Sequence, residues 1–181
     1  MRPRRRPAVP ASRRNAILQR IISGGQTGVD RAALNVAIAA AIPCGGWCPL
    51  GRRAEDGPLP LHYPLKETDS PQYDVRTRLN VQEADGTLII TRGPLRGGTA
   101  LTVDVARRMA RPVHMIDLRE SGRQHVAETM HWLQQQRVRT LNVAGPRESQ
   151  QPGIYSEAQA LLLELVGAVR AMTVTLGHTI D

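Results

Sequence analysis

Residues 23–30, Ser-Gly-Gly-Gln-Thr-Gly-Val-Asp, have the residue types and spacing of an anion-binding turn. An apolar run ends here in glycines, and an alanine-rich pattern of helical period follows at once. This pattern predicts a strand, a tight loop and the beginning of a helix. The first N–H groups of a helix have no partner within the helix, and its dipole is positive at this end. The chemistry that the turn favours is therefore the binding of a phosphate or another anion.

A second turn of the same kind lies at residues 96–99, Arg-Gly-Gly-Thr, between a strand-like run and a helical pattern. Its glycines let the backbone approach a ligand. Thr99 can cap the helix and offer its hydroxyl to a phosphate. Because both turns follow strands that we expect at the centre of a sheet, we expect them to face one another across a single crevice that binds a phosphorylated ligand.

Charged and polar side chains in the neighbouring segments are candidates to complete this site. Arg52, Arg53 and Glu55 lie in a long loop after the second expected strand. Guanidinium groups bind phosphates bidentately, and a carboxylate accepts N–H groups of a heterocycle. Arg76 and Asn80 lie four residues apart on one face of an expected helix. The alternative for the loop residues is an exposed charge cluster, and for the helix pair it is surface polarity and capping.

Other chemistries find less support in the sequence. The pattern Ser-x-Gly-x-x-Gly of residues 23–28 follows the dinucleotide fingerprint only in part, and no acidic residue ends the second strand to bind a ribose. Lys66 is the single lysine of the chain, which excludes a P-loop lysine. The two cysteines, four residues apart, have no second Cys or His pair to complete a zinc site. We find no catalytic triad, and we predict no catalytic and no metal-binding residue.

The chain has 181 residues, of which 41% are hydrophobic and 22% charged, as expected of one domain with a core. No apolar run is long enough to cross a membrane, and the first twenty residues lack the apolar region of a secretory signal. We therefore expect a cytoplasmic protein that is not embedded in a membrane.

Residues 1–20 contain seven arginines and no acidic residue, and without these charges the net charge falls from +8 to +1. We interpret residues 1–18 as a disordered arginine-rich tail and residues 19–181 as the ligand-binding domain. A nucleic-acid-binding arm and a transit peptide are the alternatives for the tail. Aromatic residues make up only 3% of the chain, so platforms for stacking nucleic-acid bases are scarce.

Strand-like apolar runs alternate with helical patterns along the rest of the chain. The predicted strands are residues 19–24, 43–47, 87–91, 112–118 and 139–144, and the predicted helices are residues 27–41, 72–84, 99–110, 123–136 and 154–169. This alternation predicts an α/β, Rossmann-like open parallel sheet with helices on both faces, in a single domain. Ligands of such sheets bind at the carboxyl ends of the strands, where the strand order reverses. The loops after the first two strands and after residue 91 are therefore the expected site.

These motifs together resemble those of the molybdenum cofactor carrier family, a Rossmann-like branch related to the cytokinin-activating phosphoribohydrolases. The resemblance covers about residues 20–170. Its longest motif is Gly-Gly-Trp-Cys-Pro-Leu-Gly-Arg-Arg-Ala-Glu-Asp-Gly at residues 45–57, beside residues 23–32, 63–68, 73–81, 85–89 and 97–99. Leu50 stands where many relatives have a basic residue, which would remove one phosphate contact.

The resemblance implies a homo-oligomeric protein that holds molybdenum cofactor (molybdopterin), or a similar nucleotide-like anion, as cargo. Carried over to this chain, it assigns ligand binding to Gly24, Gly25, Gln26, Thr27, Gly28, Asp30, Arg31, Arg52, Arg53, Glu55, Arg76, Asn80, Gly97, Gly98 and Thr99. One alternative is a nucleoside 5'-monophosphate phosphoribohydrolase, although the catalytic Glu of those relatives is missing after residues 97–99 and Asp104 follows instead. Another alternative is a single-stranded nucleic-acid-binding module that uses the tail.

Overall fold

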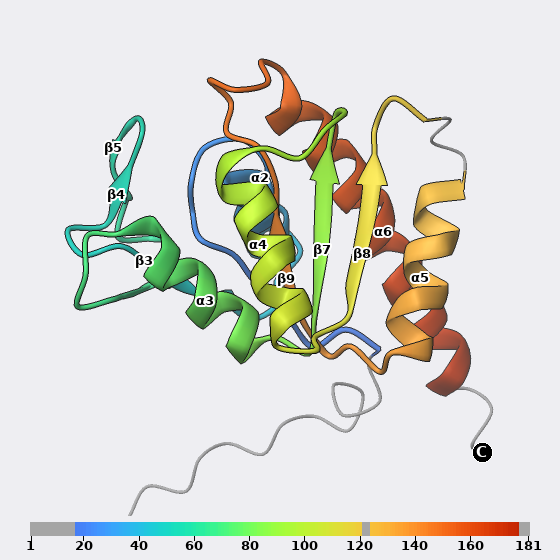
Figure 1. Cartoon of the computed structure of the whole chain (residues 1–181). Helices are drawn as coiled ribbons and strands as arrows, with labels where there is room; N and C mark the ends of the chain where they lie inside the picture. The colour runs from blue at the N-terminus through green and yellow to red at the C-terminus, as the bar shows by residue number, and fades with distance from the viewer. Residues whose placement is uncertain (1–16, 121–123, 178–181) are drawn as a thin grey trace, which may run out of the picture.

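A central sheet of five parallel strands organises the computed structural model, which describes residues 17–120 and 124–177. The strand order is β2-β1-β9-β7-β8, and Figure 1 labels β9, β7 and β8 of this sheet. The strands are β1 (Arg20–Ile22), β2 (Cys44–Gly45), β7 (Gly86–Thr91), β8 (Val113–Asp117) and β9 (Thr140–Ala144). Residues 1–16 of the predicted tail lie outside the described residues, whereas Leu18, just before β1, is buried in the core.

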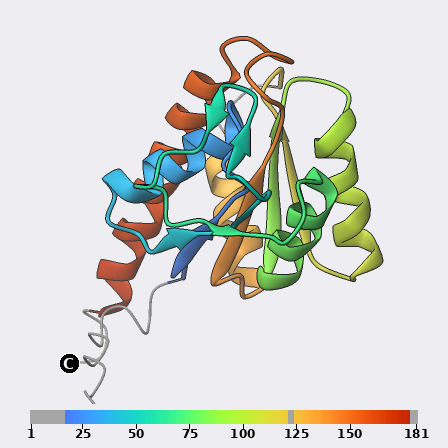
Figure 2. The ribbon, with the colours of Figure 1, turned by 90° about the vertical axis from the view of Figure 1, so that its left-hand side faces the viewer.

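Helices cover both faces of this sheet, as Figure 2 shows in side view. On one face lie α2 (Val29–Ala39), α5 (His125–Gln135) and α6 (Ile154–Gly177), whose buried residues share the largest hydrophobic cluster. On the other face lie α3 (Tyr73–Glu83) and α4 (Gly97–Arg108), which pack against each other. The predicted open parallel sheet with helices on both faces, of Rossmann-like type, is thereby confirmed.

Local sequence accounts for these elements. All six residues of β7 are buried, as expected of a strand covered on both faces. Small side chains such as Ala33, Val36 and Ala37 are fully or almost fully buried on α2, so this helix can lie close to the sheet and to α6.

The position of β9 determines where the carboxyl ends of the strands meet. This strand is the last of the sheet in the sequence, yet it lies between β1 and β7, with Leu141 opposite Ile21 and Asn142 opposite Thr87. The chain runs outward from β1 to β2 and, on the other side, from β7 to β8. The strand order therefore reverses around β9, and the loops after β1, β7 and β9 emerge side by side.

The expected strand at residues 43–47 is divided in two at Gly46. Its first part is β2, whereas β3 (Trp47–Cys48) leaves the central sheet and pairs with β6 (Lys66–Glu67). Gly46 has a φ of 125°, and a Cβ there would lie 2.2 Å from the Ser23 carbonyl oxygen. The backbone bends at this glycine because only a residue without a side chain fits so close to β1.

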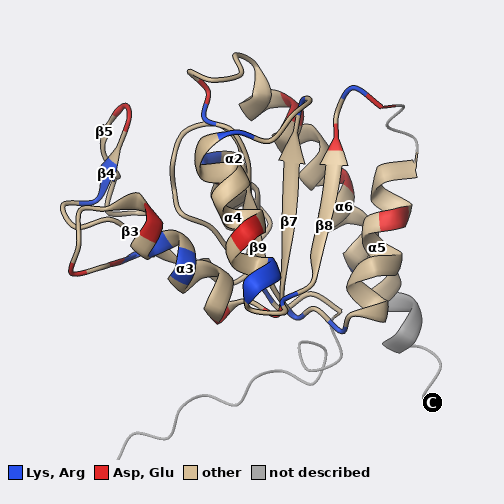
Figure 3. Cartoon of the chain, viewed as in Figure 1, with Lys and Arg blue, Asp and Glu red and all other residues tan. Residues whose placement is uncertain are grey.

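The long loop that we expected after the second strand contains a two-stranded hairpin, β4 (Arg53–Ala54) and β5 (Gly57–Pro58), besides β6. Basic and acidic residues are interspersed along the elements seen in Figure 3.

Within residues 17–120 and 124–177, no helix is both long and apolar enough to cross a bilayer. No group of three or more His, Cys, Asp or Glu residues in this part of the chain could hold a metal ion.

Candidate functional site

The first glycine turn, residues 23–28, is filled by the protein's own side chains. A Cβ at Gly24 would lie 1.4 Å from Nη1 of Arg76, and a Cβ at Gly25 would lie 2.6 Å from a methyl carbon of Leu65. Gly24 and Gly25 are buried. The two glycines therefore let an arginine and a leucine of the same chain approach the backbone closely.

An internal ion pair lies behind this turn. Asp30, in the first turn of α2, accepts a hydrogen bond from Nη1 of Arg76 at 3.0 Å and one from the backbone N–H of Gln26 at 3.4 Å. Burial raises the pKa of Asp30, although Arg76 and the N–H groups of Gln26 and Gly145 act in the opposite direction. The N–H of Gln26, which we expected to bind a ligand anion, is thus directed at a carboxylate of the protein.

The side chain of Gln26 nevertheless keeps one donor that is unpaired within the described residues. Its Oε1 accepts the backbone N–H groups of Thr27, at 3.1 Å, and of Glu55, at 2.9 Å. Its Nε2 is buried and has no hydrogen-bond partner in the described part of the chain. Only 4% of Gln26 is exposed. A buried donor without a partner is unfavourable, so a ligand acceptor at this position would be stabilising.

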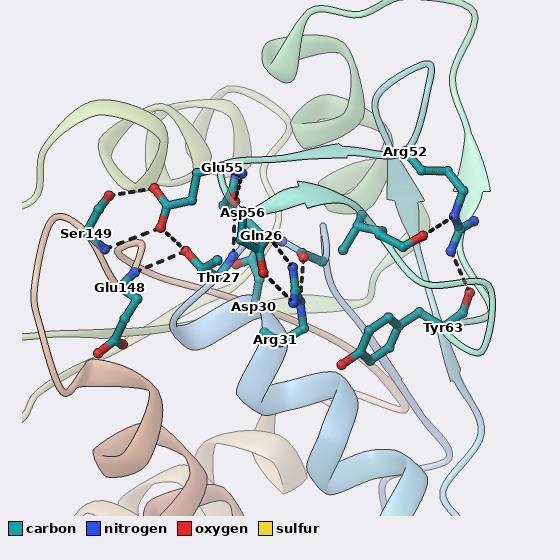
Figure 4. A network of polar contacts seen from close by, with 12 residues as sticks. Gln26, Thr27, Asp30, Arg31, Arg52, Glu55, Asp56, Tyr63, Glu148 and Ser149 are labelled. Atoms are coloured by element: carbon teal, nitrogen blue, oxygen red, sulfur yellow. Dashed lines mark hydrogen bonds and ion pairs between the residues drawn. The ribbon is translucent and has the colours of Figure 1, made fainter.

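Glu55, at the tip of the β4–β5 hairpin, joins the first turn to the loop after β9 (Figure 4). Its carboxylate accepts hydrogen bonds from the Thr27 hydroxyl and, at 2.5 Å, from the Ser149 hydroxyl. The Thr27 oxygen in turn accepts the N–H of Glu148. Desolvation by the surrounding atoms acts to raise the pKa of Glu55, but the hydrogen bonds from Ser149 and Thr27 outweigh this effect and hold the pKa below its ordinary value.

The second glycine turn is open. Gly97 and Gly98 are exposed, and a Cβ built at Gly98 meets nothing within 4 Å. The helix α4 begins at Gly97, two residues earlier than expected, so Thr99 lies within the first turn and is not the cap. Arg96 occupies the N-cap position without a side-chain capping bond. Within the described residues, the N–H groups of Gly97 and Gly98 have no hydrogen-bond partner, which leaves them free for an anion.

Two adjoining cavities lie at this edge of the sheet. The inner chamber, of about 50 Å³, is lined by residues that include Gln26, Asp30, Tyr73, Arg76, Thr77, Gly98, Thr99 and Thr102. The outer pocket, of about 360 Å³, is lined by Arg92, Pro94, Arg96, Thr99, Pro146, Gln150 and Gln151. Thr99 and Gln150 line both cavities. The two turns therefore contribute to one site, through the Gln26 side chain on one side and the beginning of α4 on the other.

Several other expected ligand-binding residues brace the protein itself. Arg52 donates hydrogen bonds to the carbonyl groups of four residues in its own loop: Leu59, Pro60, Tyr63 and Leu65. Asn80 accepts the N–H of Trp47 at 2.8 Å and donates to its carbonyl at 3.0 Å, which holds β3 against α3. These side chains lie outside the lining of both cavities.

Two more arginines of the expected site lie around the hairpin. Arg31 makes a bidentate ion pair with Asp56, at 3.1 Å for both bonds, and donates to the Gly25 carbonyl. Arg53 is exposed on β4. Among the expected residues, the two cavities bring together Gln26, Asp30, Arg76, Gly98 and Thr99.

Other cavity residues were not expected from the sequence. Arg92 follows β7, and Arg147, Gln150 and Gln151 follow β9. The general rule that ligands bind at the carboxyl ends of strands points to both loops. We missed the loop after β9 because the central position of β9 is not evident from its place as the last strand.

Comparison with known proteins agrees with this architecture. The model of the circularly permutated YpsA SLOG family matches residues 21–166. A crystal structure at 1.45 Å resolution of a "Putative molybdenum carrier protein" from Syntrophus aciditrophicus SB is 45% identical in sequence, with a TM-score of 0.81. The match covers 83% of this chain and 96% of that chain. A search of curated proteins finds no match. The chain belongs to the circularly permutated YpsA SLOG family.

Proposed function

We propose that the protein binds a small phosphorylated ligand and carries it without transforming it. The observation that supports this best is the open beginning of α4, which shares a cavity with the buried, unpartnered amide of Gln26. Free N–H groups at a helix N-terminus attract anions through both hydrogen bonding and the helix dipole. The exposed guanidinium of Arg96 adds a positive charge at the same place.

The cargo that we propose is a molybdenum cofactor of the molybdopterin type, or a similar nucleotide-like anion. The description of the related crystal structure as a molybdenum carrier supports this assignment. The phosphate would bind at the beginning of α4, and the larger organic part would lie in the outer pocket, whose volume of about 360 Å³ falls in the range of small-molecule sites. A homo-oligomeric state in the cytoplasm is part of this proposal.

The alternative of a phosphoribohydrolase finds no support in the position of its acidic candidate. Asp104 lies in α4, pairs with Arg108 at 2.5 Å and lines neither cavity. Asp30 does line the inner chamber, but its carboxylate is engaged by Arg76. A carrier without a catalytic carboxylate is therefore the simpler account.

Native mass spectrometry of freshly purified protein, followed by thermal unfolding with added ligand, tests the proposal. We expect a co-purifying phosphorylated ligand and more than one subunit. A ligand at a hundred times its dissociation constant should add about 2.7 kcal/mol to the free energy of unfolding. Absence of stabilisation by molybdenum cofactor, ADP, ATP and inorganic phosphate alike would contradict the proposal, and release of a free base from AMP would favour the hydrolase.

A further inference from the structure

The amide of Gln26 has only one favourable orientation. Its Oε1 accepts two backbone N–H groups, those of Thr27 and Glu55. Turning the amide over would place its NH₂ group against these two donors and would break both hydrogen bonds. The Nε2 donor is therefore held in a fixed direction by the first turn and by the hairpin.

A second buried donor of this kind belongs to Arg76, which also lines the inner chamber. The Nε of Arg76 is buried without a hydrogen-bond partner in the described part of the chain, while its Nη1 binds Asp30. Both Gln26 and Arg76 line the chamber, together with Gly98 at the beginning of α4. Asp30 also lies in the lining, where its carboxylate accepts hydrogen bonds from Arg76 and from the backbone N–H of Gln26.

From this arrangement we infer that the inner chamber binds a single phosphate group, and that Gln26 determines its specificity by donating from Nε2 to an unprotonated oxygen. A volume of about 50 Å³ is sufficient for a compact oxyanion. The organic part of the ligand would then lie in the larger outer pocket, which shares Thr99 and Gln150 with the chamber. This inference rests on the proposed function, since it specifies which part of the proposed ligand lies in which cavity.

The substitution Gln26→Glu tests the inference closely. It has the same shape and keeps an oxygen for the N–H groups of Thr27 and Glu55, but replaces the Nε2 donor by a second acceptor. We expect it to weaken the binding of inorganic phosphate and of ADP by about 10- to 100-fold in titration calorimetry. Gln135→Glu, at an exposed position of α5, makes the same change of charge and should leave affinity within about twofold.

Two further measurements separate ligand contact from a structural role. On addition of phosphate, the side-chain NH₂ signals of Gln26 should shift in a ¹⁵N–¹H spectrum of the wild-type protein. The affinity ratio between wild type and Gln26→Glu should also shrink as the pH falls towards about 4.3, because the introduced carboxyl becomes a donor when protonated. Equal affinity of both proteins, or unmoved Gln26 signals in a protein that binds phosphate, would overturn the inference. Failure of the wild-type protein to bind either probe would instead refute the proposed function.

Discussion

The two glycine turns of this protein look alike in sequence but differ in their surroundings. The turn at residues 23–28 is buried, and its own chain supplies both the cation and the anion beside it, Arg76 and Asp30. The turn at residues 96–99 is largely exposed and has free N–H groups at the beginning of α4. Glycine in the first turn permits close internal packing, whereas glycine in the second leaves the backbone open to a ligand. A glycine-rich turn before a helix therefore predicts that another group can approach the backbone closely. It does not predict whether that group belongs to the protein or to a ligand.

The largest expected effect on stability comes from the Asp30–Arg76 ion pair behind the first turn. Arg76→Ala leaves the buried Asp30 without its partner and should lower the free energy of unfolding by about 3–5 kcal/mol. Chemical denaturation measures this loss. As a control, Arg78→Ala removes an arginine of the same helix whose pairing with Asp74 is exposed, and should cost less than about 1 kcal/mol. Equal losses in the two variants would mean that the first turn does not depend on this pair.

The same substitution in both turns tests their difference directly. Gly24→Ala forces the Arg76 guanidinium away and should lower the free energy of unfolding by about 1–3 kcal/mol. Gly98→Ala meets open space at a helical position, so stability should stay constant or rise by up to about 1 kcal/mol. Denaturation of both proteins under one set of conditions gives the comparison. Similar losses in the two proteins would contradict the distinction between a closed and an open turn.

A smaller effect, on binding alone, is expected at the open turn. Arg96→Ala removes the exposed guanidinium beside α4 and should weaken phosphate binding about tenfold, a loss of about 1.4 kcal/mol. Its stability should change by less than about 0.5 kcal/mol. Arg107→Ala, at the other end of the same helix, removes an equal charge and should bind normally. Calorimetric titration with phosphate would show whether the position of the arginine, and not the total charge of the protein, determines the affinity for phosphate.

The smallest effect is expected where the hairpin meets the first turn. Glu55→Ala should cost less than about 1 kcal/mol, because the carboxylate is exposed, yet should speed amide hydrogen exchange in residues 53–58. The lowered pKa of Glu55 means that its contribution is complete above its ordinary value of 4.5 and is lost as the pH falls through the lowered folded value. After correction for the intrinsic pH dependence of amide exchange, exchange in the wild-type hairpin should therefore speed up in acid. Its rate should approach the rate in the Glu55→Ala variant. A hairpin whose protection is the same in both proteins at every pH would show that Glu55 does not hold it.

The elements of the fold were largely predictable because their patterns are local. Runs such as residues 87–91 and the helical pattern of residues 27–41 gave strands and helices whose ends lie within a few residues of those observed, apart from α6, which continues further. The break at Gly46 was not predicted, because it depends on the distance to Ser23 across the sheet. The lining of the candidate site was predictable only in part, since Gln26, Arg76 and Thr99 line the cavities while Arg52 supports its own loop.

By itself, the sequence determined the alternation of strands and helices, and with it a parallel sheet whose loops gather at one edge. The tertiary structure alone decided that β9 lies between β1 and β7, which brings Arg147, Gln150 and Gln151 of the following loop into the lining of the two cavities. It also decided which arginines remain free for a ligand, because a guanidinium binds whatever acceptors the fold places around it. Hydrophobic periodicity and secondary-structure propensity act over a few neighbouring residues. Strand order and the pairing of charges depend instead on segments that meet only after folding.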